Sequence, residues 1–238
     1  MSTKPIALVV GVGPGLGASL GRRFGREGLH VVLAARQRAH VDPVVETIKA
    51  KGGSAEGHAL DATDEASVER LFSTLDATGA TLNLAVYNAS GFMRTSILDA
   101  SAAEFERGWR VGCFGGFLVG REAAKRMAKS GAGTILFTGA TASWRGSAQF
   151  FNFAVGKFGL RALAESMARE LQPKGVHVAH IVIDGQIQSE RYAPLAKERP
   201  PDGLLDPDAI AETYWQLHRQ HRSAWTFEQE VRPWVEKF

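Results

Sequence analysis

Short apolar segments alternate with longer helical segments along most of this chain of 238 residues. The apolar segments contain few polar residues, which is typical of strands buried on both faces of a parallel sheet. Strict alternation of strand and helix predicts an α/β fold, a doubly wound parallel sheet with right-handed crossovers and helices on both faces. The predicted strands are 6–10, 30–35, 55–60, 82–87, 134–138 and 176–183.

Composition narrows the class of protein further. No break in composition separates two parts of the chain, so residues 1–238 are expected to form a single domain. No apolar run approaches the roughly 20 residues that span a bilayer, and the start of the chain lacks the pattern of a signal peptide. The one cysteine, Cys113, fits a reducing compartment, so we expect a cytoplasmic protein without membrane contact. The net charge is +3, but the basic residues are scattered along the chain, which argues against a nucleic-acid partner.

A glycine-rich loop, "VVGVGPGLGAS", joins the first predicted strand to the first predicted helix. Glycines allow a tight turn and a close approach of the backbone to a pyrophosphate, and the helix N-terminus adds free N–H groups. This position in a strand–loop–helix unit predicts dinucleotide binding and a Rossmann-like sheet. The residues assigned to the phosphate loop are Gly11, Gly13, Gly15, Leu16 and Gly17.

The end of the second strand bears on the choice of dinucleotide. An acidic residue there would bond the ribose 2′-hydroxyl of NAD, but the chain has Ala35 followed by Arg36. An arginine can grip a 2′-phosphate, which favours NADP(H). The alternative is that Arg36 is an ordinary surface arginine at a strand end.

The pattern loosens after residue 183. Residues 184–205 are polar and contain three prolines, which suggests a lid over the substrate. Asp206 and Pro207 predict the start of a helix over 206–221, and 223–231 is expected to be a last strand. His218 and His221 lack a third ligand nearby, so we predict surface residues and no metal site.

Several motifs together resemble the short-chain dehydrogenase/reductase family over nearly the whole chain. Gly11, Gly15 and Gly17 match its glycine loop, "LDATD" resembles its adenine-contacting segment, and "YNAS" is similar to its NNAG turn. "FAVGK" (153–157) lies on its YxxxK motif, and "IDGQIQS" (183–189) parallels its PG motif. The resemblance implies cofactor contacts from Asp61, Ala62, Asn88, Ala89, Ser90, Lys157, Ile187 and Ser189.

The family's catalytic tetrad is carried over only in part. Its asparagine falls on Gly112, its serine on Ala140 and its tyrosine on Phe153, while its lysine is kept as Lys157. The proline of the PG motif is Asp184. The chain therefore resembles a divergent subgroup with phenylalanine in place of the tyrosine. In the family the lysine bonds the nicotinamide ribose and lowers the pKa of the tyrosine, and only the first task needs no tyrosine.

These residues leave two functions open. The first is an NADP(H)-dependent oxidoreductase acting on a small organic molecule, with Lys157 as cofactor anchor and a proton from water or another group. Asp184 is one candidate donor, with loop capping as its alternative interpretation. Thr138, Thr141, Ser143 and Asn152 lie near the same strand ends. The second function is a non-catalytic NADP(H)-binding protein, a cofactor sensor or an assembly partner.

Two predicted helical segments are apolar around much of their circumference. A helix covered by a single sheet is expected to keep a polar face toward water. We therefore expect a second subunit to cover them, in a homodimer or homotetramer, as the family resemblance also implies. The segments are 109–120 and 150–167.

Overall fold

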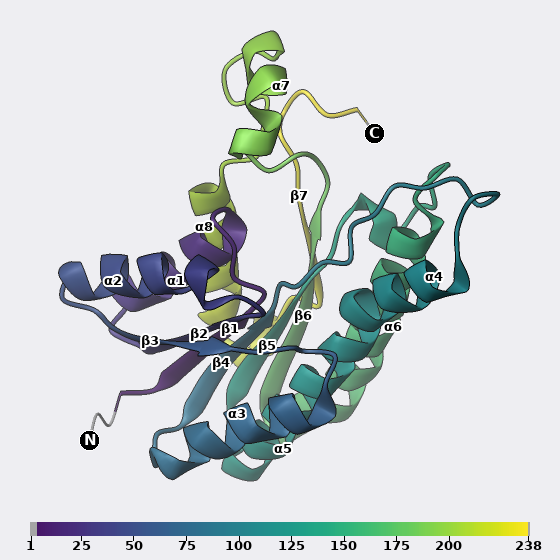
Figure 1. Ribbon diagram of the computed structural model, residues 1–238. Coiled ribbons are helices and arrows are strands. Elements are labelled where there is room, and N and C mark those ends of the chain that lie inside the picture. The colour runs from purple at the N-terminus through teal and green to yellow at the C-terminus, as the bar shows by residue number, and fades with distance from the viewer. Residues whose placement is uncertain (1–3, 238) are drawn as a thin grey trace.

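The computed structural model describes residues 4–237, which form a seven-stranded parallel sheet flanked by helices (Figure 1). The strand order is β3-β2-β1-β4-β5-β6-β7, so the order reverses between β1 and β4. This confirms the predicted Rossmann-like α/β class. The strands are β1 (Ile6–Val10), β2 (His30–Ala35), β3 (Ser54–Ala59), β4 (Leu82–Tyr87), β5 (Gly133–Thr138), β6 (Val176–Ile183) and β7 (Glu228–Val231).

The helices follow the strands in the predicted alternation. The longer ones are α1 (Leu16–Arg26), α2 (Asp42–Ala50), α3 (Glu65–Ala77), α4 (Ala102–Trp109), α5 (Gly115–Ser130), α6 (Phe151–Leu171) and α8 (Pro207–His218). A six-residue helix, α7 (Ala193–Glu198), lies in the predicted lid segment. One turn of π-helix, η2 (Arg110–Phe114), joins α4 to α5. Short 3-10 turns are η1 (Arg38–His40), η3 (Thr141–Ser143), η4 (Gln172–Lys174), η5 (Glu190–Tyr192) and η6 (Arg222–Ala224).

Helices cover both faces of the sheet, which explains why the strands are apolar without alternation. α1, α2 and α8 cover one face, where Phe24 and Tyr214 are fully buried (Figure 1). α3, α5 and α6 cover the other face, where Phe72 and Leu160 are fully buried. All eight residues of β6 are buried, as expected for an inner strand.

The predicted boundaries hold best where strands are buried. β1, β2, β4 and β6 have the predicted bounds, whereas β3 and β5 each begin one residue earlier. The predicted last strand was too long, because β7 pairs with β6 only from Glu228 onward. The helix after the lid begins at Pro207 as predicted, with the Asp206 carboxylate accepting from the N–H of Asp208 at 2.7 Å, but it ends at His218.

His218 corrects a second prediction. It is half-buried rather than fully exposed, and its Nδ1 lies 2.9 Å from the hydroxyl of Thr134 on β5. Burial lowers the pKa of His218 to about 4, so the ring is neutral at pH 7. Within residues 4–237, no group of three or more histidine, cysteine or acidic side chains is placed to hold a metal ion.

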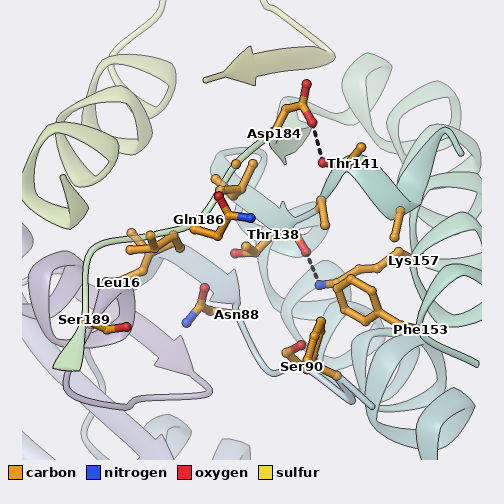
Figure 2. A pocket seen from close by; sticks show the side chains of 18 of the residues that line it. Leu16, Asn88, Ser90, Thr138, Thr141, Phe153, Lys157, Asp184, Gln186 and Ser189 are labelled. Carbon is orange, nitrogen blue, oxygen red and sulfur yellow. Dashed lines mark hydrogen bonds between the residues drawn. The ribbon is translucent and has the colours of Figure 1, made fainter. Parts of the chain in front are cut away.

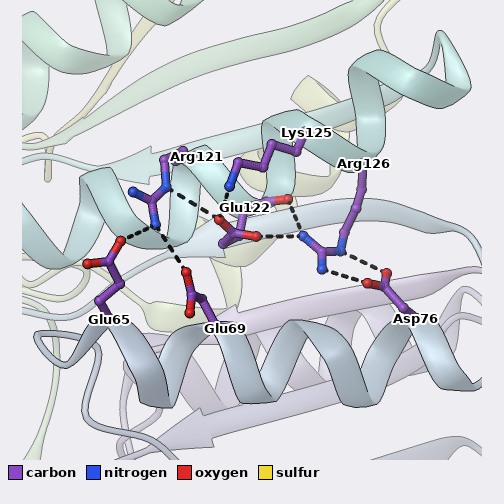
Figure 3. A network of polar contacts seen from close by, with 7 residues as sticks. All are labelled: Glu65, Glu69, Asp76, Arg121, Glu122, Lys125 and Arg126. Atoms are coloured by element: carbon purple, nitrogen blue, oxygen red, sulfur yellow. Dashed lines mark hydrogen bonds and ion pairs between the residues drawn. The ribbon is translucent and has the colours of Figure 1, made fainter.

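A polar network ties α3 to α5 on the outer side of one helical layer (Figure 3). Its centre is Glu122, whose side chain is only 7% exposed and is bonded to Lys125 at 2.6 Å and Arg126 at 2.8 Å. Arg126 also reaches Asp76 on α3 at 2.6 Å. Burial alone would raise the pKa of Glu122, but the two cations outweigh burial and hold it below its ordinary value. The network fixes two neighbouring helices without contributing to the site.

Apolar side chains remain exposed on the helices for which a second subunit was predicted. Each is more than a third exposed, and the subunit contact stays a prediction. Among the described helices, none combines the length and apolar character needed to cross a membrane. The exposed side chains within the predicted segments are Trp109, Phe117, Val155 and Phe158.

Candidate functional site

Two cavities lie along the carboxyl edge of the sheet, at the point where the strand order reverses. The larger measures about 620 Å³ and the smaller about 330 Å³. Both are lined by Gly11, Gly13, Asn88 and Ser90, so together they make one elongated site. In open α/β sheets this is the place where ligands bind.

The turn after β1 brings this edge together. Gly11 adopts φ +96°, and a Cβ there would lie 2.3 Å from the backbone nitrogen of Ala89 after β4. The side-chain amide of Asn88 donates to the carbonyl of Gly11 at 2.8 Å. Only glycine allows this backbone conformation and this close approach at once.

The start of α1 is suited to an anion. The helix has no acidic residue in its first turn, and its N-cap, Gly15, provides no side chain to occupy the free N–H groups. A Cβ built on Gly13 or Gly15 would meet no protein atom within 4 Å, and both residues line the larger cavity. The loop therefore presents bare backbone to the cavity beside a positive helix end, a suitable cradle for a pyrophosphate.

The smaller cavity lies on the β2 side of this loop. Arg36 and Asp61 both line it, as does Ala62. The backbone N–H of Thr63 donates to Asp61 at 2.9 Å and holds the pKa of this carboxyl below its ordinary value, with Arg36 adding an attractive charge. The cavity thus pairs a fixed carboxylate with an exposed guanidinium.

Lys157 lies in the wall of the larger cavity, one helical turn after Phe153. The lysine is only 2% exposed, and its ammonium donates to the carbonyl of Thr138 at 2.6 Å (Figure 2). Burial lowers its pKa to about 8, so it remains mostly charged at pH 7. The ammonium lies 5.8 Å from the centre of the Phe153 ring, within the range of a cation–π contact.

Asp184 also lines this cavity and is held by side chains. It accepts from the hydroxyl of Thr141 (Figure 2). Arg232 lies 2.9 Å from its second oxygen. Side-chain partners thus take the place of the backbone N–H groups expected of a loop cap. These contacts tie the buried carboxylate to neighbouring side chains, which argues against a role as proton donor.

Thr138 and Ser143, which were also considered as donors, are engaged as well. The hydroxyl of Thr138 lies 2.7 Å from that of Tyr214, and Ser143 accepts from the N–H of Ala140 at 3.1 Å. Neither Ser143 nor Asn152 is among the lining residues.

Every predicted cofactor residue lines one cavity or both. The larger is lined by Gly11, Gly13, Gly15, Leu16, Gly17, Asn88, Ser90, Lys157, Ile187 and Ser189, and the smaller adds Arg36, Asp61, Ala62 and Ala89.

Several lining residues were not found from the sequence. Phe92, Phe150 and Tyr192 line the larger cavity, together with Arg145 and Glu236. They come from loops, a short helical turn and the C-terminal segment, where no period marks a side chain as inward-facing. The position of Arg145, seven residues after a buried strand, was the one available signal.

Comparisons with known proteins agree with this geometry. The family model for short chain dehydrogenase matches residues 5–199. The crystal structure of a short-chain dehydrogenase from Rhodopseudomonas palustris is 40% identical, with a TM-score of 0.84, covering 97% of this chain and 99% of that one. The chain belongs to the short-chain dehydrogenase family. The chain is therefore an NAD(P)-dependent oxidoreductase of this family.

Two further relatives show the range of the family. A metagenomic short-chain oxidoreductase solved in complex with NADP is 26% identical, with a TM-score of 0.84 and 98% of both chains covered. Sorbitol-6-phosphate 2-dehydrogenase of Escherichia coli K12 is 28% identical over 212 residues, which is 88% of this chain and 82% of the relative. The expected family membership is thus confirmed, and the divergent subgroup stays a prediction.

The glycine loop gives a paired test of structure and binding. Gly13→Ala should leave the free energy of unfolding within about 0.5 kcal/mol, because the new methyl meets no protein atom. It should weaken NADPH binding at least about tenfold, because the methyl enters the cavity. Gly11→Ala should lower the free energy of unfolding by at least about 2 kcal/mol through strain and the clash with Ala89.

Urea unfolding and calorimetric titration with NADPH separate the two effects. Unchanged NADPH affinity in Gly13→Ala would show that the cavity beside this glycine does not hold the cofactor.

Proposed function

We propose that this chain is an NADP(H)-dependent oxidoreductase that works without the tyrosine donor of its family. The observation that carries the proposal is the buried ammonium of Lys157, held at the cavity wall beside the ring of Phe153. Burying a charged lysine costs free energy unless the ammonium is paired or takes part in binding. Binding a cofactor is a use that persists after the tyrosine has been replaced.

The lining residues fit the cofactor from end to end. Lys157 donates one N–H to the carbonyl of Thr138, and its two remaining N–H groups would be available for ribose hydroxyls. The bare loop before α1 would receive the pyrophosphate, and Asp61 would face the adenine side. Ile187 and Ser189 would hold the carboxamide. When bound, the nicotinamide supplies or accepts the hydride.

The residues at the family's catalytic positions are poorly suited to donate a proton to the substrate. Phe153 has no acidic proton, and Ala140 has no hydroxyl to polarise a carbonyl. Gly112 is packed against α6, where a Cβ would lie 3.0 Å from the Cα of Gly156, so a side chain such as asparagine is excluded. Losing a positioned general acid costs typically 10²–10⁴-fold in rate.

We therefore assign substrates whose reduction needs little protonation as the hydride arrives. Activated carbon–carbon double bonds, iminium ions and strongly electrophilic carbonyls have this property, and water would supply the proton. The site contributes positioning of the two reactants, which can itself lower the barrier by several kcal/mol.

The same missing donors favour a second function, a protein that binds NADP(H) without turnover. Such a protein would keep the loop, Arg36 and Lys157 and would not need an acid. Turnover separates the two functions, whereas cofactor affinity does not.

NADP(H) is proposed over NAD(H) because Arg36 is the exposed cation of the smaller cavity and the strand before it ends in alanine. The NADP bound to the metagenomic relative supports this choice. Arg36→Ala should weaken NADPH binding about ten- to a hundredfold, the worth of a charge-assisted hydrogen bond, and leave NADH unchanged.

Calorimetric titration with both cofactors measures this, with Arg38→Ala as control. Arg38 is equally a surface arginine, bound to Asp42 at 2.7 Å, and it does not line the cavity. Equal affinities of the wild type for NADPH and NADH would remove the basis for the assignment.

Turnover is tested by NADPH consumption at saturating cofactor with crotonaldehyde, a cyclic iminium ion and an α-keto ester. We expect substrate-dependent consumption that falls at least about tenfold in Lys157→Met, which keeps the buried stem and removes the ammonium. Lys125→Met, on the α3–α5 network, is the control and should keep its rate. Tight NADPH binding without consumption of any substrate would favour the non-catalytic binder.

A further inference from the structure

We propose that the larger cavity selects a planar, conjugated ring substrate that carries an anionic group, with the ring on a phenylalanine wall and the anion on Arg145. This rests on the proposed function, because it names the substrate class of the same site. The cofactor contacts proposed above use the glycine loop, Lys157, Ile187 and Ser189. The proposal concerns three phenylalanine rings and Arg145 of the same lining, to which those contacts assign no role.

Three phenylalanine rings form one wall of this cavity. The centre of the Phe92 ring lies 5.3 Å from that of Phe153, edge to face, and 5.7 Å from that of Phe150. All three line the cavity, although Phe92 is still 42% exposed. An exposed aromatic wall inside a cavity is costly in water, and a flat ring that covers it recovers this free energy.

The wall is held in place from outside. The guanidinium of Arg191 lies 5.1 Å from the centre of the Phe92 ring, and that of Arg94 lies 5.7 Å from the Phe150 ring. Arg94 is in turn bonded to the side chain of Gln149 at 2.8 Å. These contacts limit the rotation of the rings, so little entropy is lost when a ligand stacks on them.

Arg145 provides the polar end of the same cavity. Its side chain is 53% exposed, and the contact that the structure shows for it is an ion pair with Asp184 at 3.7 Å. Arg232 approaches the same carboxylate more closely, at 2.9 Å, and also pairs with Glu230. Arg145 therefore keeps most of its donors for a ligand, and a planar guanidinium matches a carboxylate or similar anion.

The remaining carboxylate of the lining does not cancel this charge. Glu236 is paired with Arg199 at 3.2 Å. A cationic ligand would thus face Arg145 without a free partner, and a polyol would leave its hydroxyl groups unpaired against the rings, at a cost for each group. A flat apolar ring with one anionic group pairs with Arg145 and places no unpaired hydroxyl group against the rings.

Calorimetry on the full-length protein with saturating NADP⁺ tests the assignment without turnover. The probes are 2-naphthoate, the neutral planar 2-naphthamide and the anionic non-planar cyclohexanecarboxylate. We expect 2-naphthoate to bind at least about tenfold more tightly than either of the others. Arg145→Gln should weaken 2-naphthoate at least about tenfold and leave 2-naphthamide unchanged. Phe92→Ala should weaken both naphthyl probes about three- to tenfold.

Matched controls are available on the outer helices. Arg70→Gln removes an exposed arginine that also faces a carboxylate at 3.7 Å, and Phe117→Ala removes a 38% exposed ring under a guanidinium at 5.2 Å. Both should bind all probes as the wild type does.

Three results would overturn the proposal. They are equal affinity of the three probes, unchanged 2-naphthoate affinity in Arg145→Gln, or the same loss in the control variants. Because the readout is binding, a protein that binds 2-naphthoate as expected but consumes no NADPH would contradict only the enzymatic function.

Discussion

The site depends on the close contact between the turn at Gly11 and the backbone after β4. A positive φ at Gly11 and the bond from Asn88 bring two neighbouring strand ends together. This contact sets the start of α1 above the carboxyl edge of the sheet and opens a cavity on each side of it. The proposed binding of a dinucleotide depends largely on this backbone geometry and needs none of the family's catalytic side chains.

The two sides of the larger cavity have different chemistry. One part of the wall holds the buried ammonium of Lys157, bonded to a strand carbonyl, whereas the positions aligned with the family's serine and tyrosine are apolar here. Under the proposed function, cofactor binding and acid catalysis are separated in this site, and only cofactor binding retains its groups. The phenylalanine wall and Arg145, which line the same cavity, are the groups that we propose to recognise the substrate.

The sequence was informative where one local rule decides the outcome. Buried parallel strands show as continuous apolar runs, so the inner strands were predicted within one residue, and the glycine loop and Lys157 were predicted to share a site. β7 was overextended because pairing with β6 decides where it begins. Phe92, Arg145 and Glu236 were missed because they reach the cavity through loop conformation and through contacts between distant parts of the chain.

The central claim is that the site has kept its cofactor anchor, Lys157, while the family's serine and tyrosine are replaced by Ala140 and Phe153. The most direct test is the rate of reduction of a simple ketone by the double variant Ala140→Ser with Phe153→Tyr. Because Lys157 already lies one turn away, the new phenol should gain a lowered pKa, and the rate should rise at least about a hundredfold over a slow wild type. A wild type that reduces simple ketones as fast as the double variant, while both bind NADPH equally, would contradict the account.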